Sequence, residues 1–327
     1  MNVLITGGGG FIGSHLVEDQ LQRGRTVKAV DLDLSLLNRW GDHPRLQLIQ
    51  GDIRDKELMR KSLEGIELVF HLASAHLSLV TPERDYWEVN VQGVEELVQL
   101  CRIADVKRFI HCSSVGVYGN IVNPPADEES PCHPELVYEQ TKLAGEQALC
   151  RFYGRTGYPI SIVRPVWAYG PRCPRTAKLF RTIRKRHFIM VGNGQTQRHC
   201  VYISDLVDGL NLCAEHEEAI GQTFIIGDNA AVTVQQLVEE IAAIMQVPPP
   251  WLKVPIGVMA PICRIVEAMW TARGKEPPLS QRSLRFFTGN TSCDITKAKT
   301  TLQFSPRVNL KDGLQRTYES LRQDGFI

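Results

Sequence analysis

The first thirteen residues constrain the fold more than any other part of the chain. An apolar run, Val3–Thr6, leads directly into Gly7-Gly8-Gly9-Gly10-Phe11-Ile12-Gly13, and apolar residues then recur with helical spacing through Ser14–Arg23. A strand, a glycine turn and a helix in this order allow the backbone to approach a pyrophosphate at the helix N-terminus. The alternative is a flexible turn that binds nothing. We predict a dinucleotide-binding loop whose cofactor contacts are Gly7, Gly10, Phe11, Ile12 and Gly13.

A second apolar run, Val27–Val30, ends at Asp31, about twenty residues after the glycine loop. A carboxylate at this place accepts hydrogen bonds from the adenosine ribose hydroxyls and repels a 2′-phosphate. Asp31 therefore favours NAD over NADP, unless it is only a solvated residue at a strand end. Arg39 is the nearest cation that could weaken this preference.

Strand and helix patterns continue to alternate after Asp31. Short apolar runs at 46–49, 68–72, 108–113 and 160–163 are separated by helical patterns at 86–104 and 138–153. This alternation predicts an α/β fold with a doubly wound parallel sheet of the Rossmann type. We place the NAD-binding domain at 1–165 and a smaller, mainly substrate-binding lobe at 166–327, with some segments returning to the sheet. Helices are also expected at 233–245 and 310–322.

Composition excludes several classes of function. The 327 residues carry a net charge of +1, which argues against a nucleic-acid partner. No apolar run reaches the ~18 residues of a membrane span, and the longest candidate, Val254–Trp270, is interrupted by Arg264 and Glu267. We expect that segment to cover a pocket, with a position on a lipid surface as the alternative. Nine cysteines without a Cys-x-x-Cys pair indicate neither a disulfide framework nor a metal site, and they fit a cytoplasmic location.

The chemistry-bearing residues lie around the second helical pattern. Tyr138 and Lys142 are four residues apart and therefore share one helix face. A phenol has a pKa near 10 and needs a nearby cation before it can lose its proton at neutral pH, and Lys142 supplies that cation. Ser114 ends the preceding strand, where its hydroxyl could hold the substrate oxygen. Tyr-x-x-x-Lys alone is common on helix surfaces, so its context after a nucleotide-binding half carries the interpretation.

With these residues in view, the whole chain resembles the extended short-chain dehydrogenase/reductase superfamily, and in particular its NAD-dependent epimerase/dehydratase group. The resemblance rests on the glycine loop and on several later motifs: Gly51-Asp52-Ile53-Arg54-Asp55, His71-Leu72-Ala73-Ser74, Asn90-Val91-Gln92-Gly93, Ser113-Ser114-Val115-Gly116-Val117-Tyr118-Gly119, Arg164-Pro165, Tyr169-Gly170-Pro171-Arg172, Gly192-Asn193-Gly194, Val201-Tyr202-Ile203-Ser204-Asp205 and Asp294-Ile295-Thr296-Lys297-Ala298 with Phe304-Ser305-Pro306.

The resemblance implies residue roles that spacing alone does not give. It makes Ser114, Tyr138 and Lys142 the catalytic residues, and it implies a homodimer formed through helices near 86–104 and 138–153. It places Asp52 and Ile53 beside the adenine, and further cofactor contacts at Leu72, Ala73, Ser74, Asn90, Tyr138, Lys142 and Pro165.

The resemblance also narrows the reaction. Dehydratases of the group carry an acidic pair directly after the catalytic hydroxyl residue, and some epimerising reductases carry a cysteine there, whereas this chain has Val115 and Gly116. What remains is 4-epimerisation of a nucleoside-diphosphate sugar through a transient ketone, or plain dehydrogenation.

Two residues of the second half favour different substrates. Arg198 matches an arginine that binds the diphosphate of a sugar nucleotide, where bidentate geometry suits the anion. Trp167 stands where such enzymes usually carry an asparagine, and it favours a sterol-like or flavonoid-like alcohol or ketone. Surface exposure of Arg198 and core packing of Trp167 are the alternatives without a ligand. A protein of this fold that senses nucleotides without catalysis is a third class, disfavoured because both Tyr138 and Lys142 are present.

Overall fold

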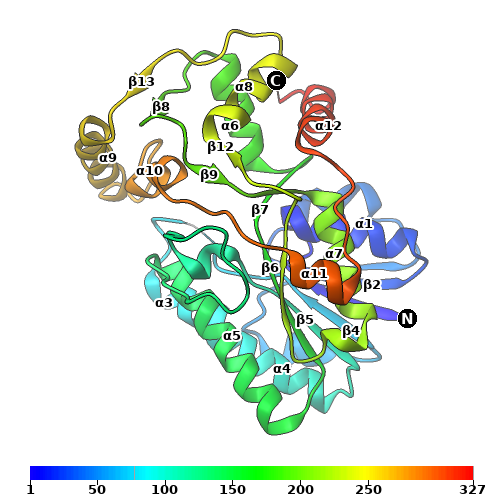
Figure 1. The fold of residues 1–327 in the computed structure, drawn as a ribbon. Helices are drawn as coiled ribbons and strands as arrows, with labels where there is room; N and C mark the ends of the chain where they lie inside the picture. The colour runs from blue at the N-terminus through cyan, green and yellow to red at the C-terminus, as the bar shows by residue number, and fades with distance from the viewer. Residues whose placement is uncertain (77, 327) are drawn as a thin grey trace.

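The computed structural model describes residues 1–76 and 78–326. Within them, seven strands form one parallel sheet in the order β11-β6-β5-β4-β1-β2-β3 (Figure 1). The sheet strands are β1 (Asn2–Thr6), β2 (Thr26–Asp31), β3 (Leu46–Gln50), β4 (Leu68–His71), β5 (Arg108–Cys112), β6 (Ile160–Pro165) and β11 (Thr223–Ile226). This arrangement confirms the expected doubly wound Rossmann sheet.

Alternation along the strands divides the core into two layers. In β1, Val3 and Ile5 enter one hydrophobic cluster, whereas Leu4 between them enters the other. Successive strand residues point to opposite faces, so both faces of the sheet are buried under helices. The helices are α1 (Phe11–Gln22), α2 (Lys56–Ser62), α3 (Glu83–Trp87), α4 (Gly93–Ile103), α5 (Val137–Thr156), α6 (Pro174–Arg184), α7 (Ile203–Glu215), α8 (Val234–Ile244), α9 (Ile256–Thr271), α10 (Gln281–Thr288), α11 (Thr296–Leu302) and α12 (Leu310–Gln323).

The helix expected at 86–104 differs from the structure in one respect. It begins at Glu83, and α3 and α4 are joined by a π-helical turn, η2 (Glu88–Gln92), that contains Asn90. A π-turn inserts one extra residue into a helix and often marks a functional site. The 3-10 helical segments are η1 (Ser35–Trp40), η3 (Val115–Tyr118) and η4 (Glu217–Ala219).

The second half of the chain both completes the sheet and builds a separate layer of helices. Strand β11 pairs with β6, so this segment does return to the sheet. A separate layer above the sheet in Figure 1 contains helices α6, α8, α9, α10 and α12. Two-stranded pairs connect the parts: β7 (Trp167–Tyr169) with β10 (Cys200–Tyr202), β9 (Gln197–Arg198) with β12 (Val232–Thr233), and β8 (Met190–Val191) with β13 (Lys253–Val254).

A buried ion pair holds α5 against the sheet. The Nη2 atom of Arg164 on β6 lies 2.6 Å from the Glu146 carboxylate on α5, and Nη1 of the same guanidinium donates to the Tyr118 hydroxyl at 2.6 Å. Charged groups buried in this way are stable only when each is paired, as here. The pair therefore fixes α5, which carries Tyr138 and Lys142, relative to the strand ends.

None of the helices in the described residues is both long and apolar enough to cross a membrane. All nine cysteines are free thiols. Over the same residues, no group of three or more histidine, cysteine or acidic side chains could hold a metal ion.

Candidate functional site

The glycine loop is packed too tightly for any side chain at its key positions. Gly7 has a φ of +72°, and a Cβ atom there would lie 2.6 Å from the Ala73 backbone nitrogen. A Cβ atom on Gly13 would lie 2.0 Å from the Gly7 carbonyl oxygen. Helix α1 follows from Gly10 without a side-chain cap, so its first N–H groups are available to an anion. This cradle fits the pyrophosphate of a dinucleotide.

Asp31 closes the cradle at the end of β2. Its carboxylate accepts hydrogen bonds from the backbone N–H groups of Gly9 at 2.9 Å and Asp33 at 3.2 Å. Burial raises the pKa of Asp31, and these hydrogen bonds oppose the rise. Arg39 is engaged elsewhere, because its guanidinium lies 3.8 Å from the centroid of a Trp40 ring. Arg39 also pairs with Glu18, so the Asp31 carboxylate is held by backbone N–H groups and not by this cation.

The remaining expected cofactor contacts lie along the same edge of the sheet. Asp52 follows β3 and is held by Arg54 at 2.7 Å, whose hydrogen bonds hold its pKa below the usual range. Ile53 is buried, and Pro165 is the last residue of β6. Leu72, Ala73 and Ser74 follow β4.

Asn90 ties this edge to helix α5. Its side chain accepts from the hydroxyl of Ser74 and the N–H of Ala75, and donates to the carbonyl of Ala75 and the hydroxyl of Thr141. The four bonds hold the residues after β4 against helix α5 from the π-turn.

The three catalytic candidates converge where β5 meets α5. Ser114 follows β5, and its hydroxyl accepts from the N–H of Gly116 at 3.0 Å. Lys142 is buried and donates from Nζ to the carbonyl of Cys112 at 2.7 Å. Tyr138 lies one turn before Lys142 in α5. The structure therefore brings together all three residues that the sequence singled out.

The electrostatics of the catalytic group follow from its partial burial. Burial raises the pKa of Tyr138, while the positive charge of Arg175 and a hydrogen bond with Ser114 oppose the rise. Burial lowers the pKa of Lys142. Burial thus favours the uncharged form of both groups, and the Tyr138 phenol, beside the Ser114 hydroxyl, is placed to exchange a proton with a bound hydroxyl.

His76 is a site residue that the sequence gave no reason to expect. Its ring meets the Tyr138 ring edge-on, with centroids 5.0 Å apart. Partial desolvation and the positive charges of Arg175 and Lys142 lower the pKa of His76. Only the fold shows that the loop after β4 and the start of α6 face the phenol, so a local motif could not have identified either His76 or Arg175.

An ion pair next to Tyr138 joins the two halves of the chain. Both carboxylate oxygens of Glu139 lie 3.1 Å from Nη1 of Arg285 on α10. One of these oxygens also accepts from the N–H of Leu136 at 3.1 Å and so caps α5. Helix α10 is thereby held beside Tyr138.

The two expected substrate residues lie against α10. Trp167 on β7 packs face to face with Tyr169 and edge to face with Phe286, each with ring centroids 6.2 Å apart. Arg198 on β9 is buried and donates to the backbone carbonyls of Phe286, at 3.0 Å, and of Arg285. Arg198 thus stabilises the C-terminal end of α10, a favourable place for a cation. To contact a diphosphate, Arg198 would have to use its remaining N–H donors or give up its hydrogen bonds to these carbonyls.

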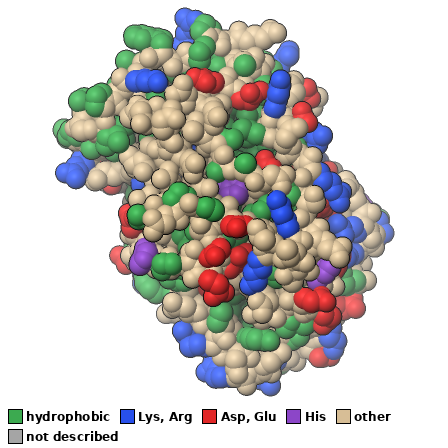
Figure 2. Space-filling view, in the orientation of Figure 1, with side chains coloured by type: hydrophobic (Ala, Val, Ile, Leu, Met, Phe, Trp, Pro, Cys, Tyr) green, Lys and Arg blue, Asp and Glu red, His purple; other side chains and the backbone are tan. Residues whose placement is uncertain are grey.

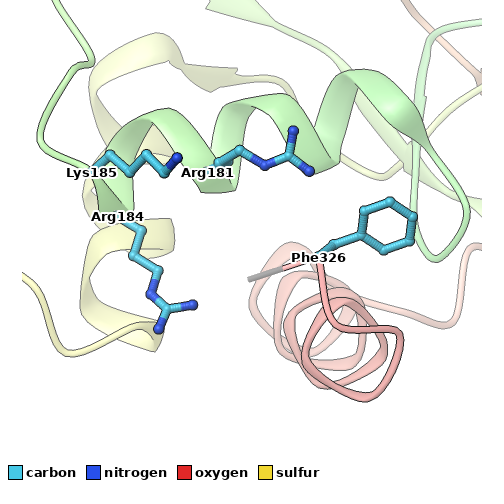
Figure 3. A pocket seen from close by; sticks show the side chains of 4 residues that line it. All are labelled: Arg181, Arg184, Lys185 and Phe326. Atoms are coloured by element: carbon cyan, nitrogen blue, oxygen red, sulfur yellow. The ribbon is translucent and has the colours of Figure 1, made fainter.

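A further recess, with a volume of about 270 Å³, lies between the end of α6 and the chain after α12 (Figure 3). Its lining residues are Arg181, Arg184, Lys185 and Phe326, and all four are exposed. None of them belongs to the site around Tyr138, and we regard the recess as a solvated basic surface.

Comparisons with known proteins agree with this geometry. A model of the NAD dependent epimerase/dehydratase family matches residues 3–227. A protein of Escherichia coli O157:H7 named N-acetyl-alpha-D-glucosaminyl-diphospho-ditrans,octacis-undecaprenol 4-epimerase is 29% identical, with 97% of this chain and 94% of that protein covered. An Arabidopsis thaliana protein named 3beta-hydroxysteroid-dehydrogenase/decarboxylase isoform 1 is also 29% identical, with 97% and 79% covered. The crystal structure of UDP-glucuronic acid 4-epimerase from Bacillus cereus in complex with NAD has a TM-score of 0.81 at 26% identity, with 99% of each chain covered.

Proposed function

The chain belongs to the NAD-dependent epimerase/dehydratase family, and from that premise we propose that it is a 4-epimerase acting on a nucleoside-diphosphate sugar. The observation that carries the proposal is the composition of the site. Ser114, Tyr138 and Lys142 converge, and the residues directly after Ser114 are Val115 and Gly116, which supply neither the acidic pair of the dehydratases nor the cysteine of the epimerising reductases. Epimerisation needs only these three residues and NAD.

A cation beside Tyr138 supports an anionic substrate. The positive charge of Arg175 acts on both Tyr138 and His76. Arg285 is less available to a substrate, because it is already paired with the carboxylates of Glu135 and Glu139. A diphosphate would be attracted to this face of the site, because charge-assisted hydrogen bonds from arginine are among the strongest available to such an anion.

Each catalytic residue then has a definite task. The hydroxyl of Ser114 would hold the oxygen of the reacting sugar carbon, and Tyr138 would exchange the proton of that oxygen. Lys142 would stabilise the phenolate form of Tyr138 through its positive charge. When bound, NAD supplies the position that accepts a hydride from the sugar carbon and returns it.

NAD contacts are assigned to the glycine loop, Asp31, the strand-end residues 52–53 and 72–74, and Pro165. The Gly7 and Gly13 contacts and the uncapped start of α1 fit this assignment. We further propose that two copies associate through α4 and α5, as the family resemblance implies.

A dehydrogenase of a hydrophobic alcohol or ketone is the second candidate. The half-buried rings of Trp167 and Phe286 favour it, because a flat apolar substrate gains contact area on such rings. The Arabidopsis relative carries the name of a steroid enzyme, which supports the same candidate.

A substrate panel distinguishes the two. The purified protein with NAD is incubated with UDP-, GDP- and dTDP-sugars, an undecaprenyl-diphosphate sugar and a 3β-hydroxysteroid, and products are followed by NMR and by absorbance of NADH. The proposal predicts a second sugar epimer without accumulation of NADH. Stoichiometric NADH from the steroid, with no change in any sugar, would transfer the assignment to the dehydrogenase.

A further inference from the structure

Helix α9 exposes an apolar face. Val258, Ile262, Ile265 and Met269 follow one another at intervals of four, three and four residues, which places them on one side of the helix. Their side chains are 54%, 43%, 61% and 45% exposed, respectively. The helix is attached to the protein by its other side, where Met259 and Cys263 are buried in a small cluster with Val191 and Leu284.

The exposed face continues beyond the helix. Of the seventeen large hydrophobic residues that are exposed in the described residues, nine lie between 251 and 279: Trp251, Leu252, Ile256, Val258, Ile262, Ile265, Met269, Trp270 and Leu279. We call this set the α9 surface. Figure 2 shows hydrophobic side chains gathered over α9, with basic side chains beside them. A concentration of this kind on a protein surface marks an interaction site more often than chance exposure does.

The charges around the α9 surface are mostly positive. Four cations of the same stretch are exposed: Lys253, Arg264, Arg273 and Lys275. The two acidic side chains of the stretch accept hydrogen bonds from the protein's own backbone. Glu267 accepts from the backbone N–H of Gln281 at 2.8 Å, and Glu276 accepts from that of Leu79 at 2.6 Å.

We propose that the α9 surface docks onto a lipid bilayer with anionic headgroups, with α9 lying in the plane of the interface. An amphipathic segment with apolar side chains on one face and Lys or Arg beside it binds such membranes in two ways. The apolar side chains are buried among the acyl chains, and the cations are attracted to the anionic headgroups. Trp251, at 86% exposure, and Trp270 are the residue type that favours the boundary between headgroups and acyl chains. The occupant is therefore identified by charge complementarity as well as by apolar area.

A second copy of the chain fits the α9 surface less well. A symmetric dimer places the same patch on both sides of the contact, so the exposed cations would face each other. An anionic bilayer instead neutralises them.

Docking would also orient the site around Tyr138. The apolar helix α9 packs on α10, whose Arg285 binds Glu139 next to the catalytic tyrosine. Glu276, at the end of the α9 surface, holds the loop that follows His76. The side of the site that α10 covers would then lie close to the membrane plane. This inference concerns location and does not depend on which substrate is correct.

The test is co-sedimentation of the full chain with vesicles, without substrate. Phosphatidylcholine vesicles are compared with vesicles that contain 30% phosphatidylglycerol, and binding is measured for wild type, Ile262→Glu/Ile265→Glu and the control Val122→Glu/Asn123→Glu. Val122 and Asn123 are exposed in a loop outside both the α9 surface and the proposed dimer helices, so the control adds the same two negative charges without removing a buried contact. Circular dichroism and NAD affinity verify that each variant is folded.

We expect wild type and the control to sediment with the anionic vesicles, and Ile262→Glu/Ile265→Glu to bind at least about tenfold more weakly, because each aliphatic side chain contributes roughly a factor of ten on transfer from water. High salt should weaken wild-type binding as well. The proposal is overturned if wild type stays in the supernatant, or if Ile262→Glu/Ile265→Glu binds as well as the control. Self-association that Ile262→Glu/Ile265→Glu abolishes, without vesicle binding, would assign the α9 surface to a second copy and also overturn it.

Discussion

Asn90 provides a quantitative test of how the site is built, because its side chain makes four hydrogen bonds of known direction. Oδ1 accepts at 3.0 Å from the Ser74 hydroxyl and at 2.9 Å from the Ala75 N–H, and Nδ2 donates at 3.1 Å to the Ala75 carbonyl and at 3.0 Å to Oγ1 of Thr141. The Thr141 hydroxyl itself donates to the Tyr138 carbonyl, so it can only accept from Asn90. The Nδ2 group therefore cannot be replaced by an acceptor.

The substitution Asn90→Asp has almost the same shape but replaces that donor with an oxygen. The buried Thr141 hydroxyl loses its donor, whereas the part-buried Ala75 carbonyl keeps the Ser74 hydroxyl as a partner. We therefore expect the free energy of unfolding to fall by about 1–3 kcal/mol at pH 7.5. A buried carboxylate without a cation has a pKa above its unfolded value, so the folded variant binds a proton first. Its stability relative to wild type should therefore improve as the pH falls toward 5.

Urea denaturation followed by tryptophan fluorescence at pH 7.5 and 5.5 measures both effects. Asn123→Asp, at an exposed position, controls for the added charge. The variant should also show a lower kcat, because the bond to Thr141 fixes the turn that carries Tyr138. Stability within about 0.5 kcal/mol of wild type, or a deficit that does not change with pH, would show that the Nδ2 bonds of Asn90 do not hold this part of the site.

Three further predictions concern Asp31, Arg198 and His15, which lies on α1 beside Arg172. Because of the Asp31 carboxylate, calorimetry should show NADP binding at least about tenfold more weakly than NAD, and equal affinities would refute this role. If the substrate is a diphosphate sugar, Arg198→Ala should raise KM about ten- to a hundredfold with little change in NAD affinity, and an unchanged KM on such a substrate would show that Arg198 is not its ligand. Burial and the adjacent Arg172 lower the pKa of His15 to about 3, so the unfolded chain takes up this proton first and stability is lost as pH falls from 6.5 toward 3. His15→Gln should therefore reduce the loss of unfolding free energy between pH 7 and 4.5 by about 2 kcal/mol, whereas acid denaturation profiles that remain parallel would contradict the assignment.

Features that depend on neighbouring residues could be predicted from the sequence. The glycine loop, Asp31 and the Tyr138–Lys142 spacing each lie within one local element, and alternating strand and helix patterns were sufficient for the Rossmann sheet. The π-turn around Asn90 could not be predicted in the same way, because one inserted residue hardly disturbs helical periodicity.

Contacts between distant segments escaped prediction. Glu139 and Arg285 are 146 residues apart, and the pairing of β11 with β6 depends on a long excursion through the second half of the chain. His76 and Tyr138 meet only because β4 and β5 are neighbours in the sheet. The α9 surface was expected mainly to cover a pocket, yet only one side of α9 packs on the protein, and only the three-dimensional structure shows which side that is.

The most direct measurement of the proposed reaction follows the hydrogen on the reacting carbon. The sugar substrate is labelled with deuterium at C4 and incubated with the enzyme and NAD, and the distribution of the label is read by NMR and mass spectrometry. An epimerase whose Tyr138 exchanges only the hydroxyl proton should retain the deuterium at C4 in both epimers, and Tyr138→Phe should slow the conversion by about 10²–10⁴-fold while NAD still binds. Transfer of the deuterium to free NADH, or conversion by Tyr138→Phe within a few-fold of wild type, would contradict the account.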